Sequence, residues 1–285
     1  MLRRDRTLAL VGASILLVAA SGRAQIMLPT RQHDTLDFEL KSLRDDVTLY
    51  MGDPQELLLM DVDPKLTTLP RATYSGQANA VLQIIDQEWS ARKASGEAGG
   101  KAKDAPYGQT WEVRLSPSGP TNFSLQCDQG KNTFDFSDFQ VQKIDLSTDG
   151  ATLDVGFKRQ NPIVMESCNI RAEDGSLRFH GVINAQAKQV ALYVPGAECQ
   201  IELTGKAFEG SSEITLQGPP KSLDLVVSRK VGLKISGPAA TTAKFAADHM
   251  VQQGDVWASR DYDLAKCRIH LTFAEEIPKL TLKWN

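Results

Sequence analysis

The stretch that decides the fold is residues 144–179, IDLSTDGATLDVGFKRQNPIVMESCNIRAEDGSLRF, because it contains one short pattern twice. Each copy has an alternating run, a turn sequence and a second alternating run: Ile144–Ser147, Thr148-Asp149-Gly150 and Thr152–Val155, then Asn169–Ala172, Glu173-Asp174-Gly175 and Ser176–Phe179. Alternation of apolar and polar residues with a period of two, bounded by turn residues, is typical of half-buried β-strands. The stretch therefore predicts two strand pairs of the same layout.

A third copy follows, with strands at 190–194 and 199–203 joined by Pro195-Gly196. The turn glycines Gly150, Gly175 and Gly196 are 25 and 21 residues apart. Such a spacing fits one coil of a β-solenoid per interval, in which stacked coils share a continuous core. A β-sandwich, whose turns also recur at short intervals, is the alternative. Either way the sequence predicts an all-β fold.

Further strands are predicted towards the N-terminus, at 47–51, 57–60 and 80–85. Between them and the repeats lies KASGEAGGKAKDAP, residues 93–106, which contains no large apolar residue. Such a composition predicts a flexible linker or an exposed loop. The expected organisation is a short N-terminal β unit over residues 25–92 and a C-terminal β-solenoid over residues 107–285.

The first 24 residues have the order of a secretory signal peptide. Three arginines, at positions 3, 4 and 6, precede a largely apolar run over 8–20, and small residues follow up to Ala24. We expect cleavage after Ala24 and a mature chain in the periplasm or outside the cell. A retained membrane anchor is the alternative, although about thirteen apolar residues are too few to span a bilayer as a helix. No second long apolar run follows, so no membrane span is expected after processing.

Composition and charge exclude several classes of protein. The 285 residues are 41% hydrophobic, 24% charged and 7% aromatic, which is unlike a disordered, collagen-like or cysteine-rich scaffold chain. The net charge is −3, and it becomes −6 when residues 1–24, with four Arg and one Asp, are removed. Because a basic excess is missing, nucleic-acid binding is not expected.

Three stretches resemble the toast-rack domain of LiaF-type envelope-stress proteins and related bacterial predicted adhesins. They are VTLYMGDPQELLLMDVDPKLTTLPRATYSG (47–76), WEVRLSPSGPTNFSLQCDQGKNTFDFSDFQVQKIDLSTDGATLDVGF (111–157) and GDVWASRDYDLAKCRIHLTF (254–273). The resemblance covers roughly residues 40–285. The family's recurring Gly-x-Gly turn is replaced here by Thr148-Asp149-Gly150, Glu173-Asp174-Gly175 and Glu275-Glu276-Ile277-Pro278.

The resemblance implies a β-solenoid without catalytic activity, which in LiaF-type proteins serves sensing or protein contact at the envelope. Those proteins carry membrane helices before the domain, whereas this chain begins with a predicted signal peptide. The resemblance therefore does not imply membrane signalling. Because the turns are substituted, it also leaves open whether this chain has the partner-binding surface of the family.

Candidate catalytic carboxylates occur as pairs, and Asp61 and Asp63 are expected on one strand face. Two nearby carboxyl groups can hydrolyse a glycosidic bond. Solvated strand faces and turns carry aspartates for purely structural reasons as well. The pairs are Asp61 and Asp63, Asp135 and Asp138, and Asp261 and Asp263.

Metal, cofactor and nucleophile signals are weak. Among His33, His180, His249 and His270, only His270 has a Cys nearby, Cys267, and on a strand the two point to opposite faces. Phosphate-loop, dinucleotide and Gly-x-Ser-x-Gly motifs are missing, so no cofactor is expected. Two roles remain open for the tryptophans, a carbohydrate-binding platform and packing in the core. They are Trp89, Trp111, Trp257 and Trp284.

The cysteines share strand parity with apolar neighbours and are expected in the core. Export would permit disulfides, and four separate buried thiols are the alternative. Buried thiols are poor nucleophiles. The four are Cys127, Cys168, Cys199 and Cys267.

Two functions remain open from the sequence. The first is a non-enzymatic exported protein that binds an envelope or surface protein or glycan through its solenoid faces, in adhesion or stress sensing. The second is an exported carbohydrate-active β-helix enzyme that uses the clustered aspartates.

Overall fold

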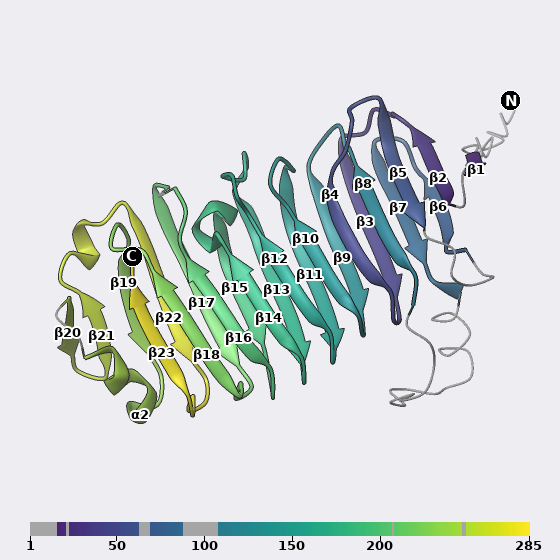
Figure 1. The fold of residues 1–285 in the computed structure, drawn as a ribbon. Helices are drawn as coiled ribbons and strands as arrows, with labels where there is room; N and C mark the ends of the chain where they lie inside the picture. Colours follow the sequence, from purple (N-terminus) through teal and green to yellow (C-terminus); the bar gives the residue numbers. More distant parts are fainter. Residues whose placement is uncertain (1–15, 21–22, 63–68, 88–107, 207, 247–248) are drawn as a thin grey trace, which may run out of the picture.

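The computed structural model describes residues 16–20, 23–62, 69–87, 108–206, 208–246 and 249–285. These residues form two long β-sheets that face each other, and the strands of both sheets follow one another along the molecule (Figure 1). Most neighbouring strands in both sheets are parallel, as successive coils of a solenoid require.

One sheet has twelve strands among the described residues. Their spatial order is β20 (Met250–Gln253), β21 (Val256–Ser259), β19 (Gly232–Ser236), β22 (Cys267–Phe273), β17 (Gly210–Gln217), β15 (Ala187–Tyr193), β13 (Met165–Glu173), β11 (Val141–Asp149), β9 (Thr121–Cys127), β3 (Thr35–Ser42), β7 (Asn79–Ile85) and β6 (Arg71–Ser75).

The other sheet has eleven described strands. Their spatial order is β1 (Leu16–Ala20), β2 (Arg23–Pro29), β5 (Glu56–Val62), β8 (Thr110–Leu115), β4 (Asp46–Met51), β10 (Lys131–Asp135), β12 (Thr152–Gly156), β14 (Ser176–His180), β16 (Glu198–Leu203), β18 (Ser222–Val227) and β23 (Leu280–Trp284). Short helical turns cover corners: η1 (Val182–Ala185), α2 (Ala239–Thr242), η2 (Ala243–Phe245) and η3 (Tyr262–Leu264).

The predicted strand pairs are β11–β12, β13–β14 and β15–β16, and in each pair the two strands lie in opposite sheets. Each strand therefore pairs with its counterpart in the next coil rather than with its partner in the same coil. Ile144 is aligned with Cys168, Cys168 with Val190 and Val190 with Ile214, so one coil takes 24, 22 and 24 residues. The all-β, solenoid-like fold predicted from the repeat is confirmed.

The corners between the sheets show why glycines recur at this interval. Gly150 has φ +74°, a left-handed conformation that residues with a Cβ atom rarely adopt. At the next corner the constraint is space, because a Cβ atom on Gly175 would lie 2.1 Å from the carbonyl oxygen of Ala151. Backbone conformation therefore favours glycine at position 150, and the close stacking of the neighbouring corner requires it at position 175.

Buried asparagines connect the coils at the opposite end of the strands. The Nδ2 of Asn161 donates to the carbonyl of Val141 at 2.7 Å, and its Oδ1 accepts from the Val141 N–H at 3.0 Å. One coil further, Asn184 donates to the carbonyl of Phe157 at 2.8 Å and accepts from the Lys206 N–H at 2.8 Å. These contacts satisfy backbone groups of irregular turns that would otherwise be buried without a partner.

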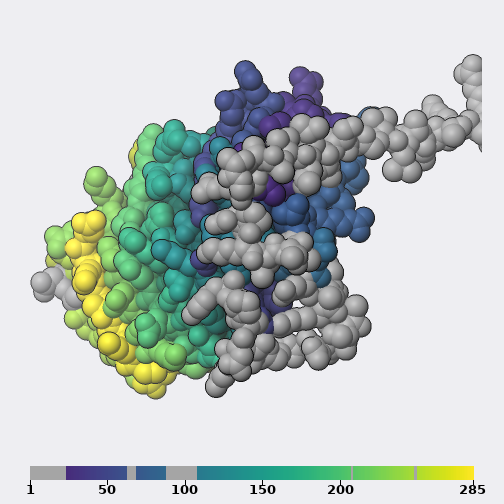
Figure 2. Space-filling model, turned by 45° about the vertical axis from the view of Figure 1, so that its right-hand side comes forward, coloured from purple at the N-terminus to yellow at the C-terminus, as the bar shows by residue number. Residues whose placement is uncertain are grey.

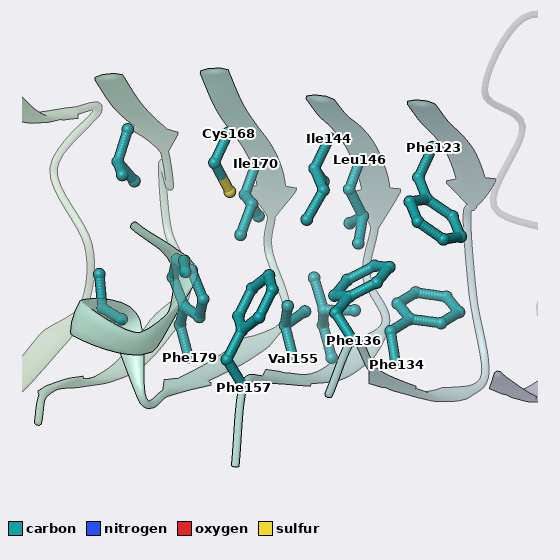
Figure 3. Packing of buried hydrophobic residues seen from close by; sticks show 14 of the residues in the cluster. Phe123, Phe134, Phe136, Ile144, Leu146, Val155, Phe157, Cys168, Ile170 and Phe179 are labelled. Carbon is teal, nitrogen blue, oxygen red and sulfur yellow. The ribbon is translucent and has the colours of Figure 1, made fainter. Parts of the chain in front are cut away.

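The core lies between the two sheets, where inward side chains of both layers meet (Figure 3). Ile144, Leu146, Cys168 and Ile170 point from the 12-stranded sheet towards Val155, Phe157 and Phe179 on the other side. Near β9 the phenylalanines make edge-to-face contacts, with ring centroids of Phe123 and Phe136 4.9 Å apart. The alternating sequence pattern thus supplies one continuous apolar layer.

The N-terminal unit shares both sheets with the C-terminal repeats. β3 pairs with β9 in one sheet, and β4 pairs with β8 and β10 in the other. The predicted linker at 93–106 lies outside the described residues, so its boundaries stay predictions. In Figure 2 the colours follow one another from blue to yellow across the molecule, as expected for coils stacked in chain order.

Of the predicted signal peptide, residues 16–20 and 23–24 are described. β1 pairs with β2 in antiparallel orientation, and the predicted cleavage point after Ala24 lies within β2. Within the described part of the chain, helices with the length and apolar character needed to cross a membrane are not found.

Candidate functional site

A hollow of about 620 Å³ lies on the outer face of the 12-stranded sheet. It crosses six neighbouring strands, β3, β9, β11, β13, β15 and β17. Its lining side chains on the outer face are Lys41, Ser124, Gln126, Asp145, Ser147, Asn169, Arg171, Ala191, Tyr193 and Gln217.

The strand registers arrange these side chains in two rows that run across the strands. The Asp145 row consists of Ser124, Asp145, Asn169 and Ala191, which are aligned on consecutive strands. The Arg171 row consists of Lys41, Gln126, Ser147, Arg171, Tyr193 and Gln217, aligned in the same way. Each coil therefore contributes one side chain to each row wherever both rows are present.

Side-chain size explains the depth of the hollow. Ser124, Ser147 and Ala191 project only short side chains from the sheet, whereas Arg171 and Tyr193 stand beside them. The Arg171 guanidinium lies 4.5 Å from the centroid of the Tyr193 ring, a cation–π contact that fixes both planes. The Tyr193 residue is 36% exposed, so its ring remains accessible at the edge of the hollow.

The charged groups of the hollow are paired within the protein. Asn169 Nδ2 donates to Asp145 Oδ1 at 2.6 Å, Arg171 forms an ion pair with Glu173, and Lys41 forms one with Glu39. The remaining polar lining groups are amides and hydroxyls. The hollow thus presents a polar surface whose two cations are ion-paired and whose remaining carboxylate, Asp145, is held by an amide, an arrangement suited to hydrogen bonding.

A second polar cluster lies further along the same face, on β19, β22 and β17. The Ser236 hydroxyl lies 3.0 Å from His270 Nε2, and His270 Nδ1 lies 2.9 Å from a Glu213 carboxylate oxygen. This order of serine, histidine and carboxylate is the one that nucleophilic catalysis uses. The sequence offered Cys267 as the neighbour of His270, whereas the structure gives this histidine a hydroxyl and a carboxylate neighbour instead.

The surroundings of this cluster differ from those of a hydrolase site. The Ser236 hydroxyl is also 3.1 Å from the Thr272 hydroxyl, and the Glu213 side chain is 60% exposed. Acyl transfer also requires donors for the developing oxyanion, and β19 and β22 direct their backbone groups into the strand ladder. Sequence reasoning missed the cluster because residues 213, 236 and 270 are far apart in the chain.

The candidate carboxylates are held by cations or amides. Asp61 is buried on β5, where it accepts from Gln25 Nε2 at 2.7 Å and forms an ion pair with Arg114; Asp63 lies outside the described residues. Asp135 accepts from Lys158 Nζ at 2.6 Å, and Asp138 pairs with Arg159. Two carboxyl groups next to a sugar groove, the arrangement expected of a glycosidase, are not formed by Asp61, Asp135 and Asp138.

The pKa of Asp135 reflects this pairing. Burial acts to raise the pKa, but the hydrogen bonds from Lys158 and Ser137 outweigh it and hold the pKa below its ordinary value. A carboxyl group in this state is ionised at neutral pH and is poorly suited to donate a proton. Asp261 and Asp263 lie at the start of η3, on the surface, as expected for turn aspartates.

The remaining candidates belong to the core or its edges. Trp111 is fully buried, Trp257 and Trp284 pack against the core, and Trp89 lies outside the described residues. Cys267 is buried while His270 is on the outer face, as the strand parity predicts. Clusters of three or more metal-ligating side chains do not occur in the described ranges.

All four cysteines are buried and free, which favours separate thiols over disulfides. They lie on β9, β13, β16 and β22, and all point into the core. Burial raises the pKa of Cys168 and of Cys199 to about 12, and raises that of Cys127 and Cys267 as well. Thiols in this state supply packing rather than nucleophiles.

No protein-family model and no curated protein matches the chain. A search of solved structures finds a candidate cell adhesion protein from Clostridium sporogenes, 13% identical, with a TM-score of 0.40. That likeness covers 92% of this chain and 100% of the other. At this identity and TM-score, the likeness says nothing about function.

Proposed function

We propose that the protein is an exported, non-enzymatic binding protein that contacts an envelope or surface component through the outer face of its 12-stranded sheet. The observation that carries this proposal is the hollow across β3 to β17, whose polar side chains are ordered in two rows. A regular, side-chain-lined surface on rigid strands supports a binding role, because the sheet holds every contact position in place before a partner arrives.

The pairing of the candidate carboxylates supports the non-enzymatic part of the proposal. The Asp61, Asp135 and Asp138 carboxylates each have a cationic partner. Acid–base chemistry needs two groups whose environments separate their pKa values in one cleft. The carbohydrate-active enzyme is therefore the less favoured alternative, and neither proposal includes a cofactor.

The sequence supports the cellular location. The Arg-rich start, the short apolar run and the small residues before Gln25 favour export to the periplasm or the outside of the cell. The resemblance to the toast-rack domain favours the same role, because that domain serves contact and sensing at the envelope. Membership of that family is part of the proposal.

The test is sedimentation of the purified mature chain with isolated bacterial envelopes. Ser147→Trp would fill the hollow with an indole, whereas Thr152→Trp places the same side chain on the outer face of the other sheet. We expect most of the envelope binding to be lost in Ser147→Trp. Thr152→Trp should bind as the original chain does. Equal binding by both variants, or no binding of the original chain, would overturn the proposal.

A further inference from the structure

We propose that the occupant of the hollow is a neutral, linear polysaccharide that lies across the strands. This inference rests on the proposed binding function and adds the chemical class of the partner. It is carried by the geometry of the two rows, by the chemistry of their side chains and by the pairing of their charges.

The geometry is that of a repeating surface. Neighbouring strands lie about 4.8 Å apart, so the six strands under the hollow offer a track of ~24 Å. A ligand that crosses the strands meets a side chain of the Arg171 row on each of the six strands and a side chain of the Asp145 row on the four strands β9, β11, β13 and β15. A polymer of identical units can place successive units over successive strands of such a track, because the length of one hexose unit is close to the strand spacing.

The chemistry of the Asp145 row suits sugar hydroxyl groups. The side chain of Asn169 offers a carbonyl oxygen and an NH₂ group, and the Asp145 carboxylate retains acceptor capacity beside its hydrogen bond to Asn169. Gln126 and Gln217 in the other row add further amides. A hydroxyl group both donates and accepts, so a surface of mixed donors and acceptors can satisfy adjacent hydroxyls.

Tyr193 adds the apolar part of sugar recognition. Each face of an aromatic ring carries partial negative charge, so the Tyr193 face that Arg171 does not cover can attract the C–H groups on one face of a pyranose ring. Arg171 stacks on Tyr193 at 4.5 Å, and Arg171 is itself held by Glu173. The aromatic plane is therefore fixed before a ligand arrives, which reduces the entropy lost on binding.

The paired charges favour a neutral chain over a charged one. Arg171 and Lys41 are each ion-paired with a carboxylate, whereas Asp145 keeps its negative charge beside a neutral amide, so both lining cations are already engaged when a polyanion approaches. An acidic polysaccharide would compete with Glu173 and Glu39 for the same cations. A neutral glycan can use all of these groups as hydrogen-bond partners without breaking the ion pairs.

A protein partner fits the hollow less well. An extended peptide binds to a sheet by pairing with a free edge strand, whereas the hollow lies over strands that have neighbours on both sides. Stable protein contacts also depend on several buried aromatic or aliphatic anchors. Tyr193 is the large exposed hydrophobic side chain of this lining.

The direct test is affinity electrophoresis of the mature chain in gels that contain mixed-linkage β-glucan, glucomannan, xylan or dextran, with polygalacturonate as the acidic probe. We expect retardation by at least one neutral polymer and none by polygalacturonate. Tyr193→Ala should weaken the binding by about five- to tenfold, and Asn169→Ala should weaken it as well. Arg178→Ala, an exposed change on the other sheet, is the matched control.

A second experiment separates this inference from the proposed function. Envelopes are treated with protease or with periodate, which cleaves the vicinal diols of sugars, before sedimentation with the mature chain. Loss of binding after periodate alone supports the glycan. Loss after protease alone, or retardation only by polygalacturonate, overturns the neutral glycan while the binding function stands. If the chain does not sediment with untreated envelopes, the binding function itself is overturned. If, in the electrophoresis test, a neutral polymer retards Tyr193→Ala and Asn169→Ala as strongly as the original chain, the assignment of the binding site to the hollow is overturned.

Discussion

At the scale of single residues, His33 is a buried histidine whose hydrogen bonds to Ser118 join two loops, so the protonation of its imidazole bears on stability. His33 is 7% exposed. Its Nε2 accepts a hydrogen bond from the Ser118 N–H at 3.3 Å, and its backbone N–H donates one to the Ser118 hydroxyl at 3.0 Å. Burial lowers the pKa of His33, although a backbone hydrogen bond to Arg31 and the charge of Asp34 oppose the shift.

The lowered pKa predicts a loss of stability in mild acid. As pH falls below about 6.5, the unfolded chain binds a proton at His33, whereas the folded chain stays neutral until its own lower pKa is reached. The free energy of unfolding should therefore decrease over this interval. Urea unfolding between pH 7.5 and pH 5 checks it, and His33→Gln should show a shallower pH dependence. An identical dependence in both chains would contradict the assignment.

Ser236 provides the most demanding test of the non-enzymatic proposal. Its hydroxyl is within hydrogen-bonding distance of His270, but the cluster is only partly buried, and oxyanion donors are not identified among the described backbone groups of β19 and β22. We expect a fluorophosphonate probe to label the purified mature chain no faster than Ser236→Ala, and p-nitrophenyl esters to show no Ser236-dependent turnover. Labelling that disappears in Ser236→Ala would show an activated serine.

At the scale of the strand, the alternation of inward and outward side chains decides which positions tolerate a charged substitution. Ile170 and Cys168 on β13 are buried, while the side chains between and beside them face outward. Ile170 is aligned with Leu146 on one side and Leu192 on the other, so it forms part of a continuous apolar row.

Replacing Ile170 by Asp should place a carboxylate among these apolar neighbours and cost about 3–5 kcal/mol of unfolding free energy. Ser167→Asp puts the same charge on the solvated outer face of β13, where Ser167 is aligned with the exposed Lys143, and should be nearly neutral. Chemical denaturation of both variants measures the difference. Equal midpoints would show that the inward assignment of β13 is wrong.

The sequence predicted the features that depend on short-range pattern. Period-two alternation located the inward cysteines, and the spacing of Gly150, Gly175 and Gly196 located three corners. It could not predict that β4 lies between β8 and β10, because this order depends on chains of contacts between distant segments. For the same reason the rows of the hollow and the approach of Ser236 to His270 emerged only when registers were known. Those contacts are set by pairing, to which each strand's own sequence contributes little.

At the scale of the whole molecule, the N-terminal strands extend the sheets of the repeats. β2 is paired with β5, and Ile26 and Leu28 are buried within the shared core. Both residues lie after the predicted cleavage point, so removal of residues 1–24 would leave this packing in place.

N-terminal sequencing of exported protein should therefore begin at Gln25 or within a few residues of it. The chain 25–285 should melt cooperatively, whereas a chain that starts at residue 30 loses Ile26 and Leu28, each worth about 1.5–3 kcal/mol of buried apolar surface. Thermal unfolding of the two chains measures this difference. Recovery of the full-length chain from membranes alone would contradict processing.

The interruption between β18 and β23 bears on how the chain folds. Within the repeats, a strand finds its partner 22 to 24 residues away, but Leu223 on β18 is aligned with Leu280 on β23, a separation of 57 residues. Closing the longer loop costs about 0.8 kcal/mol more in chain entropy, and β19 to β21 must also find places beside β22. We expect nucleation among the central coils, growth by successive addition, and late closure of the β22–β23 coil. Pulsed hydrogen exchange during refolding would then show amides of β11 to β16 protected before those of β23.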